Sequence, residues 1–320
     1  MKSTLIRAFV SLGFIALLYY VMRDDIPLIL QTLRNINHAL LAASVAVFMG
    51  SVWVMGRRLQ LIFQVKGLPI RLSETINLTL VGTFFNNFLP TSVGGDIVKA
   101  MCAARITKNT VISVSTVLMD RVFGLFTFIL IPSITLLFHI KRIGNPLVSW
   151  TVYSLLAVSI LSFFLIFHRG TARRFSFVET FLARFGWDKK ARQLYDELHD
   201  FKNHPQVIVW AMLLSVAGQS ICISVLYAMA LALGANASLI YFFLLVPVVH
   251  LVSMLPSING LGIREGAYVY FLAPYIGKEY AAALSILWLG LIFLLSIIGG
   301  IIYLLRSDYH IQFKRGAVSA

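Results

Sequence analysis

Two interruptions of apolar sequence, one in each half of the chain, contain the residue types that could bind a charged ligand. The first reads Leu-Pro-Thr-Ser-Val-Gly-Gly-Asp over 89–96, and the second reads Leu-Pro-Ser-Ile-Asn-Gly-Leu-Gly-Ile-Arg-Glu over 255–265. Proline lacks an N–H and clashes with the preceding helical turn, so Pro90 and Pro256 are predicted helix breaks. Glycine then permits close approach and unusual dihedral angles. The glycines at these two breaks are Gly94, Gly95, Gly260 and Gly262.

A helix that restarts after each break would attract an anion. Its first N–H groups have no partner within the helix, and the helix dipole is positive at that end. We interpret the two breaks as halves of one phosphate site, with Asp96 and Asn259 as helix caps in the simpler alternative. Guanidinium groups bind phosphate through two parallel bonds, which makes Arg121 and Arg264 the candidate phosphate contacts. The remaining candidate substrate-binding residues are Asn86, Asn87, Gly94, Gly95, Asp96, Lys99, Asp120, Asn259, Gly260, Gly262 and Glu265.

Asp120 and Arg121 lie about ten residues into an apolar segment that begins near residue 110. At ~1.5 Å of rise per residue they would be roughly 15 Å deep, near the centre of a bilayer. Ionisable groups at this depth are functional candidates. Adjacent helix residues do not face each other, so the two side chains should have different partners. Asp120 could instead form a structural ion pair, for which Lys99 and Arg264 are possible partners.

Three further polar residues flank the breaks. Asn86 and Asn87 precede the first break, and a buried amide in lipid must find a hydrogen-bond partner. These two residues are expected either to hold the unwound turn or to contact the substrate. His250 precedes the second break, where it is expected either to pack as a hydrogen-bonded side chain or to couple a proton.

The whole chain has the composition of a membrane protein. It has 320 residues, of which 59% are hydrophobic and 12% are charged, whereas soluble proteins are nearer a quarter charged. Several apolar runs reach the ~18–20 residues that a spanning helix needs, and the alternation typical of a β-barrel is absent. The net charge of +14 fits anionic lipid headgroups better than nucleic acid. We predict an all-α polytopic membrane protein that binds no nucleic acid.

We predict a single transmembrane domain with about six full spans and two broken, re-entrant hairpins. The spans are expected near 5–22, 39–56, 110–138, 149–167, 205–233 and 279–305. The hairpins are expected near 73–108 and 239–276, although either could be a pair of full spans. The halves are 1–167 and 205–320, joined by an amphipathic cytoplasmic connector over 168–204.

The distribution of Lys and Arg predicts the orientation in the membrane. With a cytoplasmic N-terminus, the predicted inside segments contain 20 of the 27 Lys and Arg residues and the outside loops contain five. The termini should therefore both be cytoplasmic, and the two hairpins should enter from opposite faces. Four positions also align without gaps between 89–94 and 255–260. Together these features predict an inverted repeat of the kind found in transporters, with two unrelated kinks as the alternative.

Other segments indicate no further chemistry. The connector over 168–204 combines basic residues with apolar residues at helical spacing, which is typical of a helix on the membrane surface. It is expected to join the halves or to sense lipid. Cys102 and Cys222 have no metal-binding spacing and are expected to be packing residues. We expect no metal and no cofactor, and the absence of a P-loop predicts transport without ATP.

Three strings resemble the lysylphosphatidylglycerol synthase transmembrane family, a flippase-like family also called UPF0104. They lie at 85–96, 119–124 and 258–266, in the family's order, and the resemblance covers most of the chain. It departs from the pattern at Lys99, where arginine is more usual. The resemblance implies a multi-pass protein of a bacterial or archaeal cytoplasmic membrane, with a lipid-translocating fold. It also implies that this chain is the stand-alone membrane domain, without the soluble aminoacyltransferase domain of bifunctional members.

The expected function is that of a flippase, with no enzymatic activity. A phosphate-bearing lipid, which could be aminoacylated or polyprenyl-linked, would place its headgroup in a polar cavity between the hairpins. Arg121 and Arg264 would bind phosphate, while Asp96, Asp120 and Glu265 would balance these cations, bind an amine or carry a proton. The alternatives are a secondary transporter of a small anionic solute and a membrane-embedded lipid-linked transferase. The expected partners are a membrane lipid and a further copy of the chain in a homo-oligomer.

Overall fold

The computed structural model contains four helices that are long and apolar enough to cross a membrane. It describes residues 12–13, 16–89, 93–143, 150, 153–154, 156–157, 160–161, 188–255, 257 and 260–309. The four helices are α3 (His38–Val65), α6 (Thr110–Ile143), α11 (Pro205–Ala232) and α14 (Lys278–Leu305). The described residues form helices and connecting turns, with no strand. The predicted all-α polytopic membrane fold is confirmed.

Both predicted hairpins are present as pairs of shorter helices. The first consists of α4 (Leu72–Phe88) and α5 (Gly94–Thr107), and the second of α12 (Leu239–Val252) and α13 (Ile263–Ile276). The helices therefore end and restart at the two predicted breaks. The break residues Pro90, Pro256 and Asn259 themselves lie outside the described residues.

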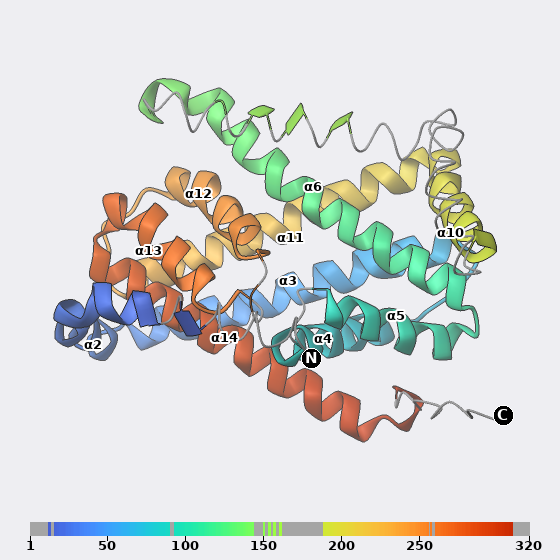
Figure 1. Ribbon diagram of the computed structural model, residues 1–320, viewed down its shortest axis with the longest axis horizontal. Helices are drawn as coiled ribbons and strands as arrows, with labels where there is room; N and C mark the ends of the chain where they lie inside the picture. Colours follow the sequence, from blue (N-terminus) through green and yellow to red (C-terminus); the bar gives the residue numbers. More distant parts are fainter. Residues whose placement is uncertain are drawn as a thin grey trace.

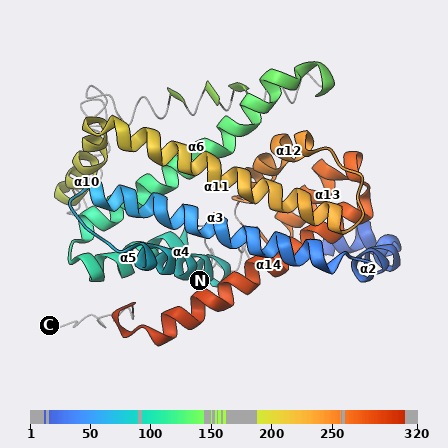
Figure 2. The ribbon, with the colours of Figure 1, turned by 180° about the vertical axis from the view of Figure 1, so that it is seen from behind.

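The long helices and hairpins are arranged in opposite directions in the two halves. α3 and α11 pack side by side and run antiparallel (Figures 1 and 2). The α4/α5 hairpin lies toward one end of this pair and the α12/α13 hairpin toward the other (Figure 1). Each hairpin is followed by a long helix, α6 in the first half and α14 in the second. This order of elements is the one that the inverted repeat predicts.

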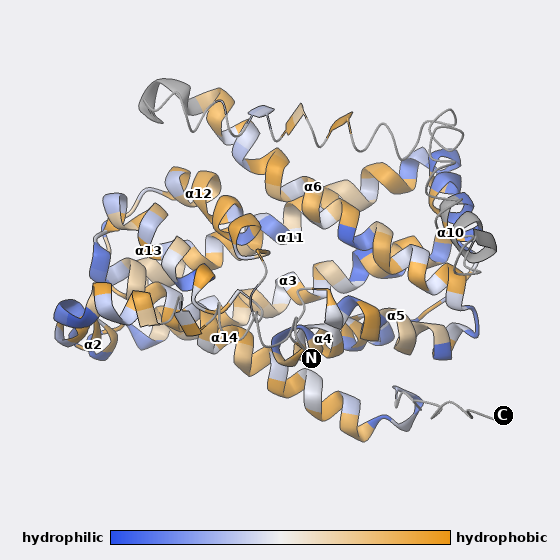
Figure 3. Cartoon of the chain, in the orientation of Figure 1, coloured by the Kyte–Doolittle hydropathy of each residue, from blue (hydrophilic) through white to orange (hydrophobic). Residues whose placement is uncertain are grey.

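Polar and apolar residues are separated along the molecule. Hydrophilic residues are concentrated at its two ends, in the short turn η1 (Arg23–Asp25) that precedes the helix α2 (Ile26–Arg34) and in α10 (Asp188–Asp200), while apolar residues cover much of α6, α11 and α14 (Figure 3). The sequence analysis did not predict α2. Most of the predicted span 149–167 and most of the connector over 168–204 lie outside the described residues, as do parts of the span 5–22.

Helix α3 continues nine residues beyond the predicted end of its span at 56. Arg57 and Arg58 favoured a loop there, but the apolar pattern resumes after them and buries one face of the added turns. Leu59, Ile62 and Phe63 are fully buried on that face. As a result, Arg58 lies inside the helix bundle rather than in a cytoplasmic loop.

The first hairpin packs closely against α14 through a glycine. A Cβ atom added at Gly299 would lie 2.1 Å from the carbonyl oxygen of Leu80 in α4. A side chain at this position would therefore push the two helix backbones apart. The same helix also contains Gly290, where an added Cβ atom would meet no atom within 4 Å.

We expect Gly299→Ala to destabilise the protein by about 1–3 kcal/mol, because the added methyl group must displace the backbone of α4. Gly290→Ala is the matched control on the same helix, and should be neutral or slightly stabilising because alanine favours helix. Thermal unfolding in detergent would measure both. Equal midpoints for the two variants would contradict the close contact between α4 and α14.

The described part of the connector is held against α3 by a buried lysine. The Nζ atom of Lys66 donates to the carbonyl oxygen of Glu197 at 2.6 Å and lies 2.8 Å from its carboxylate. It also lies 2.9 Å from Oδ2 of Asp200 and 4.6 Å from the ring centroid of Phe201. Hydrogen bonds from Lys66 and Asn203 lower the pKa of Asp200 below its usual range.

Lys66→Gln is expected to release α10 from the bundle, lowering its local opening free energy by about 1.5–3 kcal/mol through loss of charge-assisted hydrogen bonds. In the wild type, a lowered folded-state pKa means that the contribution of Asp200 is present above the ordinary carboxyl pKa near ~3.9 and is lost below it. Hydrogen exchange of residues 193–203 would measure both effects. Unchanged exchange at pH 7 in the variant would refute this role of Lys66.

Candidate functional site

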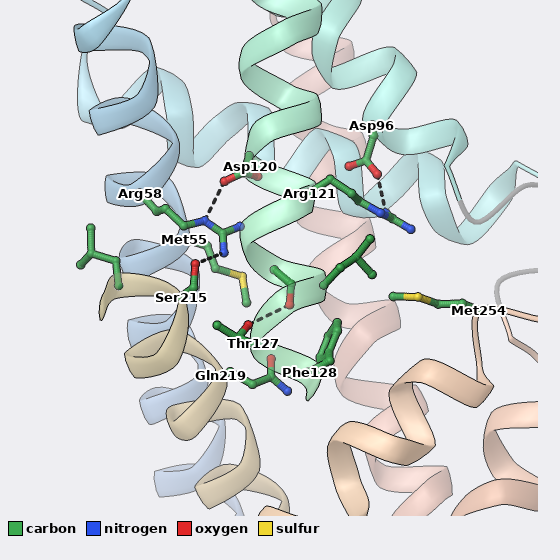
Figure 4. Close-up of a pocket in the computed structure, with 13 residues that line it drawn as sticks. Met55, Arg58, Asp96, Asp120, Arg121, Thr127, Phe128, Ser215, Gln219 and Met254 are labelled. Carbon is green, nitrogen blue, oxygen red and sulfur yellow. Dashed lines mark hydrogen bonds and ion pairs between the residues drawn. The ribbon is translucent and has the colours of Figure 1, made fainter. Parts of the chain in front are cut away.

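A cavity of about 180 Å³ lies between the long helices and reaches both predicted breaks. Its walls come from α3, α5, α6 and α11 (Figure 4). Asp96 lines it from the helix that follows the first break, and Met254 from the turn that precedes the second. Segments from both breaks therefore meet at one cavity. Its polar lining residues are Arg58, Asp96, Asp120, Arg121, Thr127, Ser215 and Gln219.

Asp120 is the centre of a buried ion network. Its Oδ1 atom accepts a hydrogen bond from Nε of Arg58 at 2.7 Å, and its Oδ2 atom accepts one from Nζ of Lys99 at 2.9 Å. Nη1 of Arg58 donates to Oγ of Ser215 at 2.7 Å. All four residues are buried. The network joins α3, α5, α6 and α11, and its two cations and one carboxylate give it a formal charge of +1.

Arg121 has a different partner on the other side of α6. It forms a charge-assisted hydrogen bond with Oδ2 of Asp96 on α5, whereas the neighbouring Asp120 points toward Arg58 (Figure 4). The prediction that Asp120 and Arg121 have separate partners is confirmed. The side chains of Arg121 and Asp96 are 26% and 19% exposed, compared with 9% for Asp120. The Arg121–Asp96 pair is therefore the more accessible part of the site.

The first break is held by Asn86. The Oδ1 atom of Asn86 accepts a hydrogen bond from the N–H of Gly95 at 2.9 Å. A Cβ atom added at Gly95 would lie 2.0 Å from the carbonyl oxygen of Gly82, so glycine is required where α4 and α5 approach each other. Gly94, which begins α5, is also buried. One N–H group that was predicted to attract an anion is thus already occupied by a side chain.

Asn87 ties the same hairpin to the second half of the chain. Its Nδ2 atom donates to Oγ of Ser296 and, at 3.4 Å, to the carbonyl oxygen of Ile292. Both acceptors belong to α14. Asn86 therefore has the contact expected of a residue that holds the unwound turn, whereas Asn87 bonds α14, and neither residue lines the cavity.

At the second break, the charged side chains of Arg264 and Glu265 bond to each other and to the backbone of the break. Gly260 and Gly262 have φ angles of +75° and +81°, which favour glycine. Oε2 of Glu265 accepts the N–H of Gly262 at 2.7 Å, while Oε1 accepts Nε and Nη2 of Arg264 at 3.0 and 2.9 Å. Arg264 and Glu265 are buried and do not line the cavity. The structure therefore does not bring Arg264 to the same cavity as Arg121.

Comparison with known families agrees with the three sequence strings. A family model described as the lysylphosphatidylglycerol synthase TM region matches residues 4–300. The chain belongs to this family. A search of curated proteins found no match. Family membership, together with the apolar helices, shows a multi-pass membrane protein and supports a role connected with membrane lipids.

In this member of the lysylphosphatidylglycerol synthase transmembrane family, four polar cavity residues were not among the sequence-based candidates, namely Arg58, Thr127, Ser215 and Gln219. Arg58 was assigned to a loop, and Ser215 and Gln219 lie in the apolar helix α11. Ser215 and Gln219 are four residues apart and so share one helix face. The apolar pattern after Arg58 was the available signal for this residue. Gln219 is buried, and its Nε2 atom has no hydrogen-bond partner among the described residues.

His250 packs beside the cavity wall. Its Nε2 atom lies 3.2 Å from the hydroxyl of Tyr268, and its ring centroid lies 5.5 Å from that of Phe128 and 5.9 Å from that of Trp288. Phe128 lines the cavity, but His250 does not. These contacts favour a packed, hydrogen-bonded histidine.

Metal-binding geometry is not found in the described part of this family member. Its described residues contain no cluster of three or more His, Cys, Asp or Glu side chains that could hold an ion. Cys102 and Cys222 are both buried and unbonded to each other, in agreement with a packing role.

Proposed function

We propose that this protein translocates a phosphate-bearing membrane lipid between leaflets. The observation that carries the proposal is the partly exposed Arg121–Asp96 pair in a cavity where segments from both helix breaks meet. Irregular backbone at membrane depth is tolerated where it is buried in protein or lines a polar cavity. Broken helices in both halves of a repeat are typical of transporter binding sites.

The cavity can accept a headgroup by exchange of ion-pair partners. A phosphate that enters would replace Asp96 as the partner of Arg121, because a guanidinium binds phosphate through two parallel hydrogen bonds. The unpaired Nε2 donor of Gln219 lines the same cavity, and so does Arg58, which supplies a second guanidinium group beside that of Arg121. Arg58 belongs to the Asp120 network, whose formal charge of +1 includes the second cation Lys99. These groups favour an anion over a neutral or cationic ligand.

The size of the cavity supports binding of a headgroup without its acyl chains. Pockets that enclose a whole small molecule usually measure about 300–1,000 Å³, whereas this one measures about 180 Å³. The acyl chains would remain in the bilayer while the headgroup crosses. We assign the end with α10 to the cytoplasm, because Lys and Arg are concentrated in the segments predicted at that face.

Arg121→Gln is expected to slow lipid translocation at least about tenfold, because it removes charge-assisted bonds worth about 1.5–3 kcal/mol. The measurement is the leaflet distribution of labelled phosphatidylglycerol in liposomes that contain the purified protein. Arg57→Gln is the matched control, since Arg57 bonds the neighbouring Gln60 and does not line the cavity. Equal translocation by wild type and Arg121→Gln would refute the proposed role.

A secondary transporter of a small anionic solute is the second candidate, because a free anion could bind the same Arg121 and Arg58 side chains in the cavity. The two functions differ in what reaches the site. A small solute would be carried into sealed liposomes against its own gradient when an ion gradient is applied. Uptake of such an anion without any movement of labelled lipid would support this candidate over the flippase.

A further inference from the structure

A second cavity lies at the end of the molecule where α4 begins and where α5 and α14 end. Its volume is about 570 Å³. No residue that lines it also lines the first cavity. The ionisable residues of its lining are Arg71, Glu74, Arg105, Arg306, Asp308 and Tyr309. Three guanidinium groups and two carboxylates give this lining a formal charge of +1.

One wall of the second cavity is fixed by Glu74. Its Oε1 atom accepts a hydrogen bond from Nη1 of Arg306 at 2.5 Å, and its Oε2 atom accepts one from the hydroxyl of Tyr309 at 2.5 Å. Tyr309 is fully buried, and its carbonyl oxygen accepts the thiol of Cys102 at 3.4 Å. This wall therefore joins the first turn of α4 to the short helix η3 (Ser307–Tyr309) and to α5.

Two of the three guanidinium groups take no part in the hydrogen bonds of Glu74 that fix this wall. Arg71 and Arg105 are exposed, and neither forms an ion pair within the part of the chain that the structure describes. They come from different elements, the residue before α4 and the last turn of α5. Besides Glu74, the lining of the second cavity contains one other carboxylate, that of Asp308. Arg71 and Arg105 thus bring two guanidinium groups to one cavity, and guanidinium groups suit phosphate because each can bind it through two parallel hydrogen bonds.

The second cavity lies away from the first along α5. Asp96 and Arg105 are nine residues apart on this helix, which corresponds to roughly 13 Å along its axis. Arg306 directly follows the apolar helix α14, so the cavity lies where the apolar part of the bundle ends. Basic pockets at this level, between membrane helices, are suited to anionic lipid headgroups.

We propose that the second cavity is an anion site that binds a phosphate group through Arg71 and Arg105. The phosphate is carried by an anionic membrane lipid or is free in solution. This assignment does not depend on the proposed translocation, because it concerns other residues and another cavity.

The test is a calorimetric titration of purified protein in phosphate-free detergent. Both titrated proteins carry Arg121→Gln, so that the first cavity contributes as little as possible. One arm uses inorganic phosphate and the other uses short-chain phosphatidylglycerol. We expect binding in at least one arm, and a Kd at least about tenfold higher after the additional change Arg71→Gln/Arg105→Gln. Binding in the phosphate arm identifies the phosphate group alone as sufficient, and binding in the lipid arm alone identifies a lipid headgroup.

The control is Arg23→Gln/Arg34→Gln in the same background. It removes the same charge from two exposed residues near α2, at the other end of the molecule. This variant should bind as its parent does. An unchanged Kd in the Arg71→Gln/Arg105→Gln variant, or no binding in either arm, would overturn the proposal. Neither result bears on the leaflet assay of Arg121→Gln, so the two proposals can fail separately.

Discussion

Replacing Asp120 with asparagine is expected to destabilise the protein by about 3–5 kcal/mol. The substitution preserves the shape of the side chain but leaves Arg58 and Lys99 buried without a carboxylate. Removal of one partner from a buried ionic group costs this much because the remaining charge is desolvated and uncompensated. Equilibrium unfolding in mixed detergent micelles would measure the change.

Two further variants show whether the loss comes from the unpaired cations. Lys99→Met in addition to Asp120→Asn removes one of the two charges, and should recover part of the lost stability. Asp96→Asn alters a partly exposed pair, for which a loss of about 1 kcal/mol or less is expected. If Asp96→Asn and Asp120→Asn were equally destabilising, the buried network would not be the main contribution.

Replacing Glu265 with glutamine is expected to have the second largest effect, again about 3–5 kcal/mol. The glutamine oxygen can still accept the N–H of Gly262, but Arg264 loses its anionic partner in a buried position. The loss therefore reports the ion pair rather than the helix cap. Thermal unfolding in detergent is a suitable measurement, and the turn at the second break should become more accessible to protease.

The double variant Arg264→Met/Glu265→Gln removes both charges and should be more stable than Glu265→Gln alone. Glu279→Gln is the control, because Glu279 is only half-buried and forms no ion pair among the described residues. It should change the stability by less than about 0.5 kcal/mol. A double variant as unstable as Glu265→Gln would show that Arg264 does not depend on its neighbour.

The fold was predictable because membrane helices have a local signature in the sequence. Apolar runs of spanning length identified α3, α6, α11 and α14, and the Leu-Pro strings identified the two breaks. The short helix α2 was missed since it is too short to span. The end of α3 was misplaced because charged residues usually mark a span end, whereas Arg58 is neutralised by a carboxylate 62 residues later. That compensation depends on tertiary contact, which the local pattern does not reveal.

The candidate site was predictable in part. Asp120 and Arg121 were named from their charge and depth, and Asp96 from its place at the first break. All three line one cavity. Ser215 and Gln219 were missed because single polar residues in an apolar helix have many packing roles. The placement of Arg264 could not be derived from the sequence, since adjacent helix residues are not expected to pair with each other. Its long side chain nevertheless folds back on Glu265 at the start of α13.

The close contact between α4 and α14 gives the two hairpins a mechanical connection. Gly299 lets the backbones of these helices touch, and Asn87 bonds α14 nearby. α14 also packs along α13 of the second hairpin. A displacement of the first hairpin would therefore also displace α14 and, through its contacts with α14, helix α13. Movement of the two halves would then be coupled, so that opening at one end of the bundle would change the structure at the other end.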